Sequence, residues 1–363
     1  MTTAMSNISF NVTSPPRLPF VPTQSLQSYH ISVATNVIIA VGMFGIGLTT
    51  DFYKIWYYLK RPKAYGIGVS LQLIIVPLVA WALTKIFVMN DIQALGVMIQ
   101  GCSPGGSVSN VVIYWLDGVV DLSIALTTTT TVLALGTMPL WLLIFEKGNN
   151  LDSSLRIPFR DLAITLGSFL GPLLVGTFCS WVFKKKKETS QKIAKALIVL
   201  ASVALLVTLI VNSIVQPISW TLTWQQGVIV AIMPPIIYLI GHLICMIPQL
   251  KLNSKVRRTV GIEIALQNVR ICISVLTTTF LATRPRIYGQ IVLFPILYYI
   301  FQIGYSILYG VVLHVGRRYG FIQLEEEEMI EDESEEKKKD ENETKKDPED
   351  GKENPAYEKE DKL

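Results

Sequence analysis

One carboxylate, Glu263, lies within a long apolar stretch of this 363-residue chain. An acidic side chain at the middle of a bilayer costs on the order of 3 kcal/mol, so it is expected to face a cavity, a partner or an ion. Gln267 lies four residues further on, on the same helical face, and Asn268 follows directly. Three oxygen-bearing side chains therefore gather within about one turn. The alternative is that Glu263 pairs with Arg270 or with a basic residue of a loop.

A second polar cluster is the sequence GCSPGGSVSN, from Gly101 to Asn110. Pro104, Gly105 and Gly106 argue against a continuous helix, because proline lacks a donor and glycine frees the backbone. Unwound backbone at membrane depth is tolerated where it lines a watery cavity, and its freed carbonyls suit small ions and charged groups. The alternative is a kink that allows close helix packing.

Hydroxyl groups form a third set. Ser123 and Thr127 lie four residues apart on one helical face, and threonines occupy positions 128–131. Hydroxyl and amide oxygens around one carboxylate make a hard site of low net charge, which suits sodium better than zinc or copper. Serine and threonine also pack helices and bond to their own backbone, so the hydroxyls alone would not decide the matter.

The composition places these residues in a membrane. Half of the chain is apolar and 17% is charged, against roughly 25% in soluble domains, which excludes a soluble enzyme. Stretches free of charge, of about 20 residues or more, predict an all-α polytopic membrane protein. We expect nine transmembrane helices: 31–50, 64–84, 92–116, 122–145, 162–183, two within 196–250 separated near 216–226, 259–283 and 287–316.

Basic residues set the expected orientation. Most of those in the body fall in loops that are cytosolic if the N-terminus is outside, so we predict N-outside and C-inside, in the plasma membrane. Residues 1–30 then form an extracellular segment without a cleavable signal peptide, 31–316 the nine-helix membrane domain and 317–363 a cytosolic tail. The extracellular segment carries two predicted glycosylation sites, Asn7 and Asn11.

The tail differs sharply from the body. Residues 321–363 hold 19 acidic and eight basic side chains, and we expect the tail from Leu324 onward to be disordered. The four cysteines have no CxxC spacing, so neither a disulfide framework nor a zinc site is expected. We expect contact with membrane lipid and none with nucleic acid.

The two polar clusters lie on the third and eighth expected spans. Helices five spans apart cross the bilayer in opposite directions, which is the arithmetic of an inverted repeat with two broken helices meeting at the midplane. Spans two to four would then mirror spans seven to nine.

These motifs resemble the sodium/bile acid cotransporter family. The similarity runs from about residue 41 to residue 301, and several motifs occur in the family's order. They are GCSPGG at 101–106 with Ser109-Asn110, DGVVDLS at 117–123 running into Thr127-Thr128, ALGTMPL at 134–140, Arg257-Arg258-Thr259, Glu263 with Gln267-Asn268, and FPILY at 294–298.

The resemblance implies two sodium ions as co-transported cargo and no organic cofactor. Residue by residue, the first sodium site corresponds to Ser109, Asn110, Ser123, Thr127 and Glu263. The second corresponds to Gln72, Glu263 and Gln267, with backbone carbonyls around Ile264 and Leu266. Glu263 would bridge both ions.

The resemblance also implies a substrate site between two domains. The core would contain spans two to four and seven to nine, and the panel spans one, five and six. The expected substrate is an amphipathic organic anion, a bile acid or a steroid sulfate. Contacts with it are expected from Asn268 and from the backbone near Ser103, Pro104 and Gly105.

Two departures from the family pattern bear on these expectations. Val119 and Val120 stand in the Asp117 loop where relatives often carry another carboxylate. Arg270 stands where a neutral polar residue is expected, and could attract an anion or pair with Glu263. The alternative function is a receptor or channel without coupling; an intramembrane enzyme is weaker still, since the histidines show no HExxH pattern and the sequence no GxSxG pattern.

Overall fold

The fold is described from a computed structural model. It describes residues 22–50, 52–60, 62–149, 159–182, 187–215, 222–281 and 284–319. Within these ranges the chain is helical and forms no strand; the one isolated β-bridge joins Gly105 and Gln267. The chain divides into two compact units, Met1–Gly310 and Val311–Leu363. Of the second unit, the structure describes the end of a helix and the residue after it.

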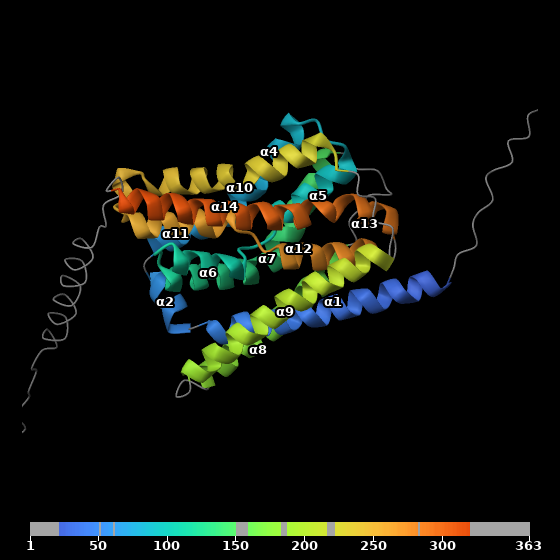
Figure 1. The fold of residues 1–363 in the computed structure, drawn as a ribbon, viewed down its shortest axis with the longest axis horizontal. Coiled ribbons are helices and arrows are strands. Elements are labelled where there is room, and N and C mark those ends of the chain that lie inside the picture. Colours follow the sequence, from blue (N-terminus) through green and yellow to red (C-terminus); the bar gives the residue numbers. More distant parts are fainter. Residues whose placement is uncertain are drawn as a thin grey trace, which may run out of the picture. The chain divides into compact units, whose positions relative to one another are not determined.

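Fourteen α-helices, two π-helical turns and one 3-10 turn make up the described chain (Figure 1). They are α1 (Pro22–Thr49), α2 (Phe52–Lys60), α3 (Pro62–Ser70), η1 (Leu71–Ile75), α4 (Val76–Ile86), α5 (Asp91–Gly101), α6 (Ser107–Trp115), α7 (Val120–Asn149), α8 (Phe159–Val182), α9 (Lys187–Val215), α10 (Trp224–Cys245), η4 (Pro248–Leu250), α11 (Ser254–Ala265), α12 (Val269–Leu276), η5 (Thr277–Leu281), α13 (Pro285–Ile291) and α14 (Leu293–Arg318).

Five described helices are long and apolar enough to cross a membrane. A sixth is added if α1 and α2, bent by 69°, count as one span. The expected spans 92–116 and 259–283 each divide into shorter helices, of which the longest runs from Val269 to Leu281 through α12 and η5. Each of these helices is shorter than a bilayer requires. The count of nine spans therefore stays a prediction. The five spans are Pro62–Ile86, Val120–Asn149, Leu162–Val182, Trp224–Cys245 and Arg286–Gly316.

The first helix begins earlier than its expected span. The apolar stretch starts at residue 31, but α1 starts at Pro22. Hydropathy delimits the part of a helix that lipid can hold, whereas the helix itself can continue into water through polar residues. The predicted glycosylation sites at Asn7 and Asn11, and the acidic tail from residue 320, lie outside the described residues.

Helices α1, α8 and α9 pack together, and α1 runs along both of the others (Figure 1). The backbones of α1 and α8 touch where they cross. A Cβ on Gly47 would lie 2.2 Å from Leu173 O, and a Cβ on Gly176 would lie 2.3 Å from Phe44 O. Only glycine fits at these two positions, since real Cβ atoms do not approach so closely.

The remaining helices of the first unit pack around the two short, divided spans. Helix α10 lies along α11, α4 along α5, and α6 along α7. The α10–α11 contact is again close, because a Cβ on Gly241 would lie 2.4 Å from Ile264 Cδ1. Helices α5, α11 and α12 are buried along most of their lengths, as expected for helices at the centre of a bundle.

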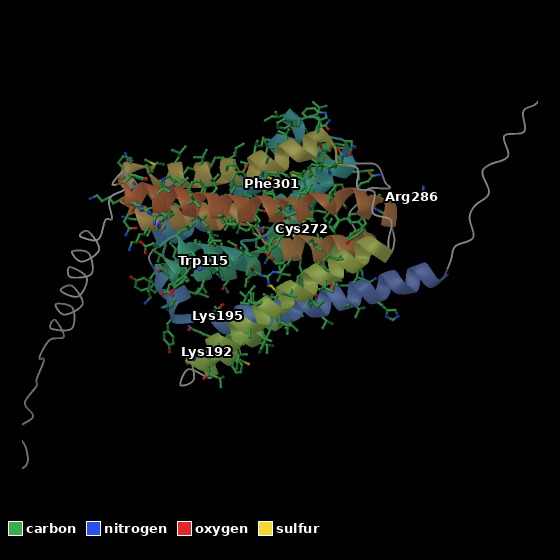
Figure 2. The ribbon with its side chains drawn as sticks, in the orientation of Figure 1. Trp115, Lys192, Lys195, Cys272, Arg286 and Phe301 are labelled. Carbon is green, nitrogen blue, oxygen red and sulfur yellow. The ribbon has the colours of Figure 1, made fainter. Side chains whose placement is uncertain are left out.

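Basic side chains mark the two ends of the helices in the first unit. Lys192 and Lys195 lie at one end, near the start of α9, and Arg286 lies at the other, in α13 (Figure 2). The predicted topology assigns the two lysines to the cytosol and Arg286 to the outside. Their separation is compatible with that orientation.

Candidate functional site

The chain leaves helical structure twice near the centre of the first unit, between α5 and α6 and between α11 and α12. The two breaks cross and are joined by backbone hydrogen bonds. Gly106 N donates to Leu266 O at 2.9 Å, and Asn268 N donates to Pro104 O at 2.8 Å. The unwinding predicted at the Pro-Gly-Gly sequence is confirmed.

Gly105 and Gly106 make this crossing possible. A Cβ on Gly105 would lie 2.6 Å from Glu263 Oε1, and a Cβ on Gly106 would lie 2.8 Å from Gln267 O. Any side chain at either position would displace the other break. The glycines therefore bring the first break against the carboxylate and backbone of the second.

Glu263 lies in the last turn of α11 and is 2% exposed. Three hydroxyl groups donate to its carboxylate: Ser109 Oγ to Oε2 at 2.7 Å, Ser123 Oγ to Oε2 at 2.5 Å, and Thr127 Oγ1 to Oε1. Ser109 comes from α6 and the other two from α7. The structure thus brings together residues that are more than 130 positions apart in the sequence.

The same hydroxyls also approach a second oxygen each. Ser109 Oγ lies 2.6 Å from Gly106 O, while Ser123 Oγ and Thr127 Oγ1 lie 2.6 and 3.4 Å from Asn110 Oδ1. A hydroxyl has one proton and donates to one acceptor at a time. Six contacts therefore share three protons. Oxygens crowded together with too few hydrogens form the donor set that a hard cation prefers.

A second group of polar atoms lies at the crossing. Gln72, in η1, donates from Nε2 to Ser103 O at 2.9 Å, and its Oε1 is buried without a hydrogen-bond partner. Both carboxamide atoms of Gln267 and Nδ2 of Asn268 are likewise buried without partners. Buried amide atoms are normally paired, so unpaired ones suggest that a ligand or water completes their contacts. The backbones of Ile264 and Leu266 lie in the same segment of the chain, at the end of α11, and Leu266 O already accepts from Gly106 N.

The residues expected to contact substrate are buried in this conformation. Ser103 is 1% exposed and Asn268 is 2% exposed, and Pro104 and Gly105 are buried as well. Ser103 Oγ donates to Ile99 O at 2.9 Å, so it belongs to the end of α5. An organic anion would reach these groups only after a movement that uncovers them.

Comparison with known proteins identifies the family. The profile of the Sodium Bile acid symporter family matches residues 36–221, which is more than half of the chain. The chain belongs to this family. It is a family of symporters and not of enzymes.

Individual relatives extend the match. The human "Hepatic sodium/bile acid cotransporter" is 34% identical over 303 residues, covering 82% of this chain and 83% of the relative. The human "Sodium-dependent organic anion transporter" is 31% identical over 272 residues, covering 75% and 70%. The human "Ileal sodium/bile acid cotransporter" is 30% identical over 285 residues, covering 78% and 80%.

These alignments bear on both breaks. The family profile includes the Pro-Gly-Gly break and the hydroxyls of α7, but it ends at residue 221. A match that covers 82% of 363 residues must extend beyond Glu263. Both halves of the candidate site therefore lie within sequence shared with symporters of this family.

The Arg270 departure from the family pattern lies on the far side of the second break. In the described part of the chain, the polar partners of Glu263 are hydroxyl groups, and Arg270 is not among them. The guanidinium instead lies beside α1, where a Cβ on Gly42 would be 3.5 Å from Arg270 Nη1.

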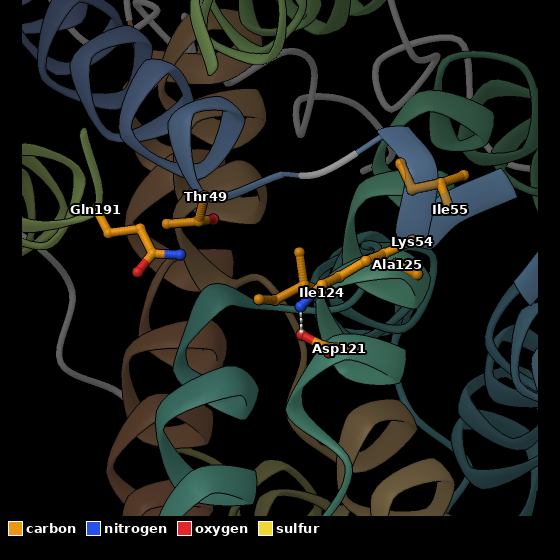
Figure 3. Close-up of a pocket in the computed structure, with 7 residues that line it drawn as sticks. All are labelled: Thr49, Lys54, Ile55, Asp121, Ile124, Ala125 and Gln191. Atoms are coloured by element: carbon orange, nitrogen blue, oxygen red, sulfur yellow. Dashed lines mark hydrogen bonds and ion pairs between the residues drawn. The ribbon is translucent and has the colours of Figure 1, made fainter. Parts of the chain in front are cut away.

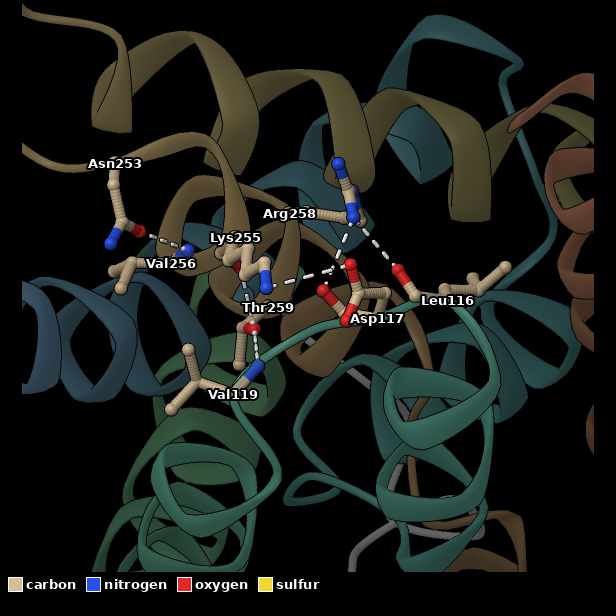
Figure 4. A network of polar contacts seen from close by, with 8 residues as sticks. All are labelled: Leu116, Asp117, Val119, Asn253, Lys255, Val256, Arg258 and Thr259. Atoms are coloured by element: carbon tan, nitrogen blue, oxygen red, sulfur yellow. Dashed lines mark hydrogen bonds and ion pairs between the residues drawn. The ribbon is translucent and has the colours of Figure 1, made fainter. Parts of the chain in front are cut away.

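The Asp117 loop is held mainly through its backbone (Figure 4). Buried Arg258 donates from Nη1 to Leu116 O at 2.8 Å and to Asp117 O at 3.2 Å, and Val119 N donates to Thr259 Oγ1 at 2.8 Å. The Asp117 carboxylate forms a longer, partly exposed ion pair with Lys255, at 3.6 Å. The contacts of Leu116, Asp117 and Val119 in this loop use backbone atoms, so they do not depend on a carboxylate at position 119 or 120.

A small pocket lies where α1, α2, α7 and α9 meet (Figure 3). Lys54 and Asp121 form an ion pair in its wall. Its volume of about 30 Å³ holds about one water molecule. It is too small for a bile acid or a steroid sulfate.

Two contacts at the crossing were not expected from the sequence. Thr130 Oγ1 accepts from Gly105 N at 3.4 Å, and Tyr298 OH donates to Ala265 O, the last carbonyl of α11, at 3.1 Å. Thr130 belongs to a threonine run that the sequence does show, but which of its members faces the break depends on packing. The phenol of Tyr298 gave no sequence signal of its own beyond the FPILY motif.

Proposed function

We propose that this protein is a sodium-coupled symporter that imports bile acids or related amphipathic organic anions such as sulfated steroids. The observation that carries the proposal is the buried Glu263 carboxylate among three hydroxyls that have more acceptors than protons. A sodium ion between these oxygens would neutralise the carboxylate and remove the oxygen crowding. The names of the relatives support sodium and an organic anion as the cargo.

The first ion would be held by Ser109, Asn110, Ser123, Thr127 and Glu263, which meet in the crowded hydroxyl cluster. The second would use the crossing. Gln72 Oε1 and Gln267 Oε1 are buried acceptors in need of a partner, and Glu263 and the carbonyls of Ile264 and Leu266 complete the set. Asn268 and the backbone of Ser103, Pro104 and Gly105 would face the anion.

The energy available fits concentrative uptake. A tenfold sodium gradient supplies about 1.4 kcal/mol per ion. Two sodium ions with one monovalent anion move one net charge, worth about 2.3 kcal/mol per 100 mV. Together these give roughly 4 to 5 kcal/mol, or about a thousandfold accumulation. Transport is therefore expected to be electrogenic.

Alternating access would come from movement of two groups of helices. We assign α1, α8 and α9 to a panel, since α8 and α9 each pack on α1, and the divided spans with their neighbours to a core. The core would consist of two inverted repeats of three spans each, in a nine-span protein of the plasma membrane with the N-terminus outside and the C-terminus in the cytosol. Relative movement of core and panel would uncover the buried anion contacts on one side and then the other.

Uptake into vesicles tests the proposal. The full chain is reconstituted, and a labelled bile acid or sulfated steroid is supplied with sodium outside or with choline in its place. We expect accumulation above the external concentration in sodium alone, increased by an inside-negative potential. Equal uptake in both media would contradict coupling and favour a channel; absence of any flux for a panel of anions would contradict the substrate class.

A further inference from the structure

Among the prolines within the described helices, two lie four residues after a carbonyl that accepts a hydrogen bond from an aromatic side chain of another helix. In α4 the residue is Pro77, which stands four residues after Leu73; in α10 it is Pro235, four residues after Ala231. In a regular α-helix, the N–H of a residue at either position would donate to the carbonyl four residues before it, but proline has no N–H. Within a membrane such a freed carbonyl has to be satisfied from elsewhere in the protein.

In both cases an aromatic side chain from a different helix donates a hydrogen bond to the carbonyl. Trp141 Nε1, in α7, donates to Leu73 O at 2.7 Å, and Tyr305 OH, in α14, donates to Ala231 O at 2.7 Å. The indole and the phenol are partly buried, and partly buried indole and phenol groups usually find a polar partner, which these carbonyls provide. Each aromatic residue therefore ties its own helix to the helix that proline interrupts.

The two bonds occupy corresponding places in the expected repeats. Leu73 lies in the second expected span and Trp141 in the fourth; Ala231 lies in the seventh and Tyr305 in the ninth. The bond thus joins the first and third spans of each three-span half. Two different donor chemistries at equivalent places indicate a shared structural requirement in both halves.

The surroundings of the two carbonyls differ in one respect. Leu73 lies in the π-helical turn η1 directly after Gln72, whose carboxamide donates to Ser103 O at the crossing and has an unpaired Oε1. The residue before Ala231 is Val230, which has no polar side chain. The bond from Trp141 therefore holds a turn that carries a candidate sodium ligand, whereas the bond from Tyr305 holds a turn that carries none.

We propose that Trp141 is a positioning residue for the second sodium ion. Its indole holds η1 through Leu73 O, and η1 in turn aims the Gln72 carboxamide at the crossing. Tyr305 is the structural counterpart in the other half, without a role in sodium binding. The assignment rests on the proposed sodium-coupled transport.

The test compares Trp141→Phe with Tyr305→Phe in the reconstituted full chain. Both changes remove one donor and keep an aromatic ring. The readout is the sodium concentration that gives half-maximal anion uptake. We expect Trp141→Phe to raise it roughly two- to tenfold, the range expected for one lost hydrogen bond, with little change in the anion KM at saturating sodium. Tyr305→Phe also removes one hydrogen bond, so it should lower the Tm about as much as Trp141→Phe does. It should leave the sodium concentration for half-maximal uptake within about twofold of the wild-type value.

A second variant separates the effect of this one hydrogen bond from a general loss of folding. Pro77→Ala gives residue 77 a backbone N–H, so η1 can pair as a regular α-helix, in which Leu73 O accepts from residue 77 and depends less on the indole. Adding Trp141→Phe to Pro77→Ala should therefore raise the sodium requirement less than adding it to the wild-type chain. Equal increases in both backgrounds, or equal sodium shifts for Trp141→Phe and Tyr305→Phe, would overturn the positioning role. A wild-type protein without any sodium dependence would instead overturn the proposed function.

Discussion

The two helix breaks at the crossing are built from different kinds of residue. The break between α5 and α6 contains Pro104, Gly105 and Gly106, and it offers backbone and space. The break between α11 and α12 contains neither proline nor glycine; Gln267 lies within it and Glu263 lies just before it. One break lacks side chains so that the other can bring its carboxylate and carboxamide close.

The ends of the two breaks are stabilised differently for the same reason. Asn268 Oδ1 accepts from Ile271 N at 3.4 Å and so caps α12, while Tyr298 OH satisfies the last carbonyl of α11. The N-cap of α6, Gly106, has no side chain to form a cap, and its N–H instead donates across the crossing. The side-chain-rich break is thus fixed by its own cap, Asn268, and by Tyr298 of α14, whereas the glycine break is fixed by its partner break and by Thr130 of α7.

The largest effect should come from removing the charge of the side-chain-rich break. Glu263→Gln keeps the size of the side chain but leaves a sodium ion without its counter-charge. Losing one partner of a buried charge pair costs about 2 to 5 kcal/mol, so sodium-driven uptake should fall on the order of 100-fold or more. Uptake at several sodium concentrations measures this, with Thr137→Val, an exposed change in α7, as the control. Uptake at the wild-type rate would show that the carboxylate is not the sodium ligand.

A smaller effect should come from adding one methyl group to the glycine break. In Gly105→Ala the new Cβ would lie 2.6 Å from Glu263 Oε1, so either the carboxylate or the break must move. Overpacking of this kind costs about 1 to 3 kcal/mol, and we expect about a tenfold loss of uptake together with a lower Tm. Gly136→Ala is the matched control, because a Cβ there meets nothing within 4 Å. If both variants behave alike, close approach at the first break is not what the glycine provides.

The smallest effect should come from one hydroxyl of the site. Thr127→Val keeps the shape of the side chain and removes a single oxygen, while Ser109, Ser123 and Asn110 remain. One hydrogen-bonding group is worth about 1 kcal/mol, so the sodium concentration for half-maximal uptake should rise roughly fivefold. The maximal rate should change little. A loss as large as that of Glu263→Gln would mean that the hydroxyl, and not the carboxylate, dominates the site.

The sequence predicted the two breaks unequally well. Proline and glycine at positions 104–106 identify the first break directly, because their backbone effects are local. The second was expected because its span lies five spans after the first, as in an inverted repeat, and because the motifs resemble a known family. Its limits at Leu266 and Asn268 depend on bonds to the first break, which no local pattern encodes.

The polar cluster around Glu263 was predictable as a set of residues and not as a geometry. The sequence marks Ser109, Ser123 and Thr127 as candidates, and their hydroxyls meet at Glu263. Each of these three hydroxyls also approaches a second oxygen, and this follows from how α6 and α7 pack against α11. The bond from Trp141 to Leu73 O was likewise not foreseeable, since a proline shows which carbonyl is freed but not which distant helix will satisfy it.

The close crossing of α1 and α8 has a consequence for how the parts can slide. With Gly47 and Gly176 in backbone contact, these two helices have no flexible side chains between them at the crossing that could adjust to a sliding movement. They should therefore move as one rigid body. Relative movement should instead occur where α1 contacts α12 and η5 through polar groups. There Asn36 Oδ1 of α1 accepts from Ser274 Oγ at 2.7 Å and from Thr278 Oγ1 at 3.3 Å. Such bonds can be exchanged for water one at a time, whereas interlocked backbones cannot.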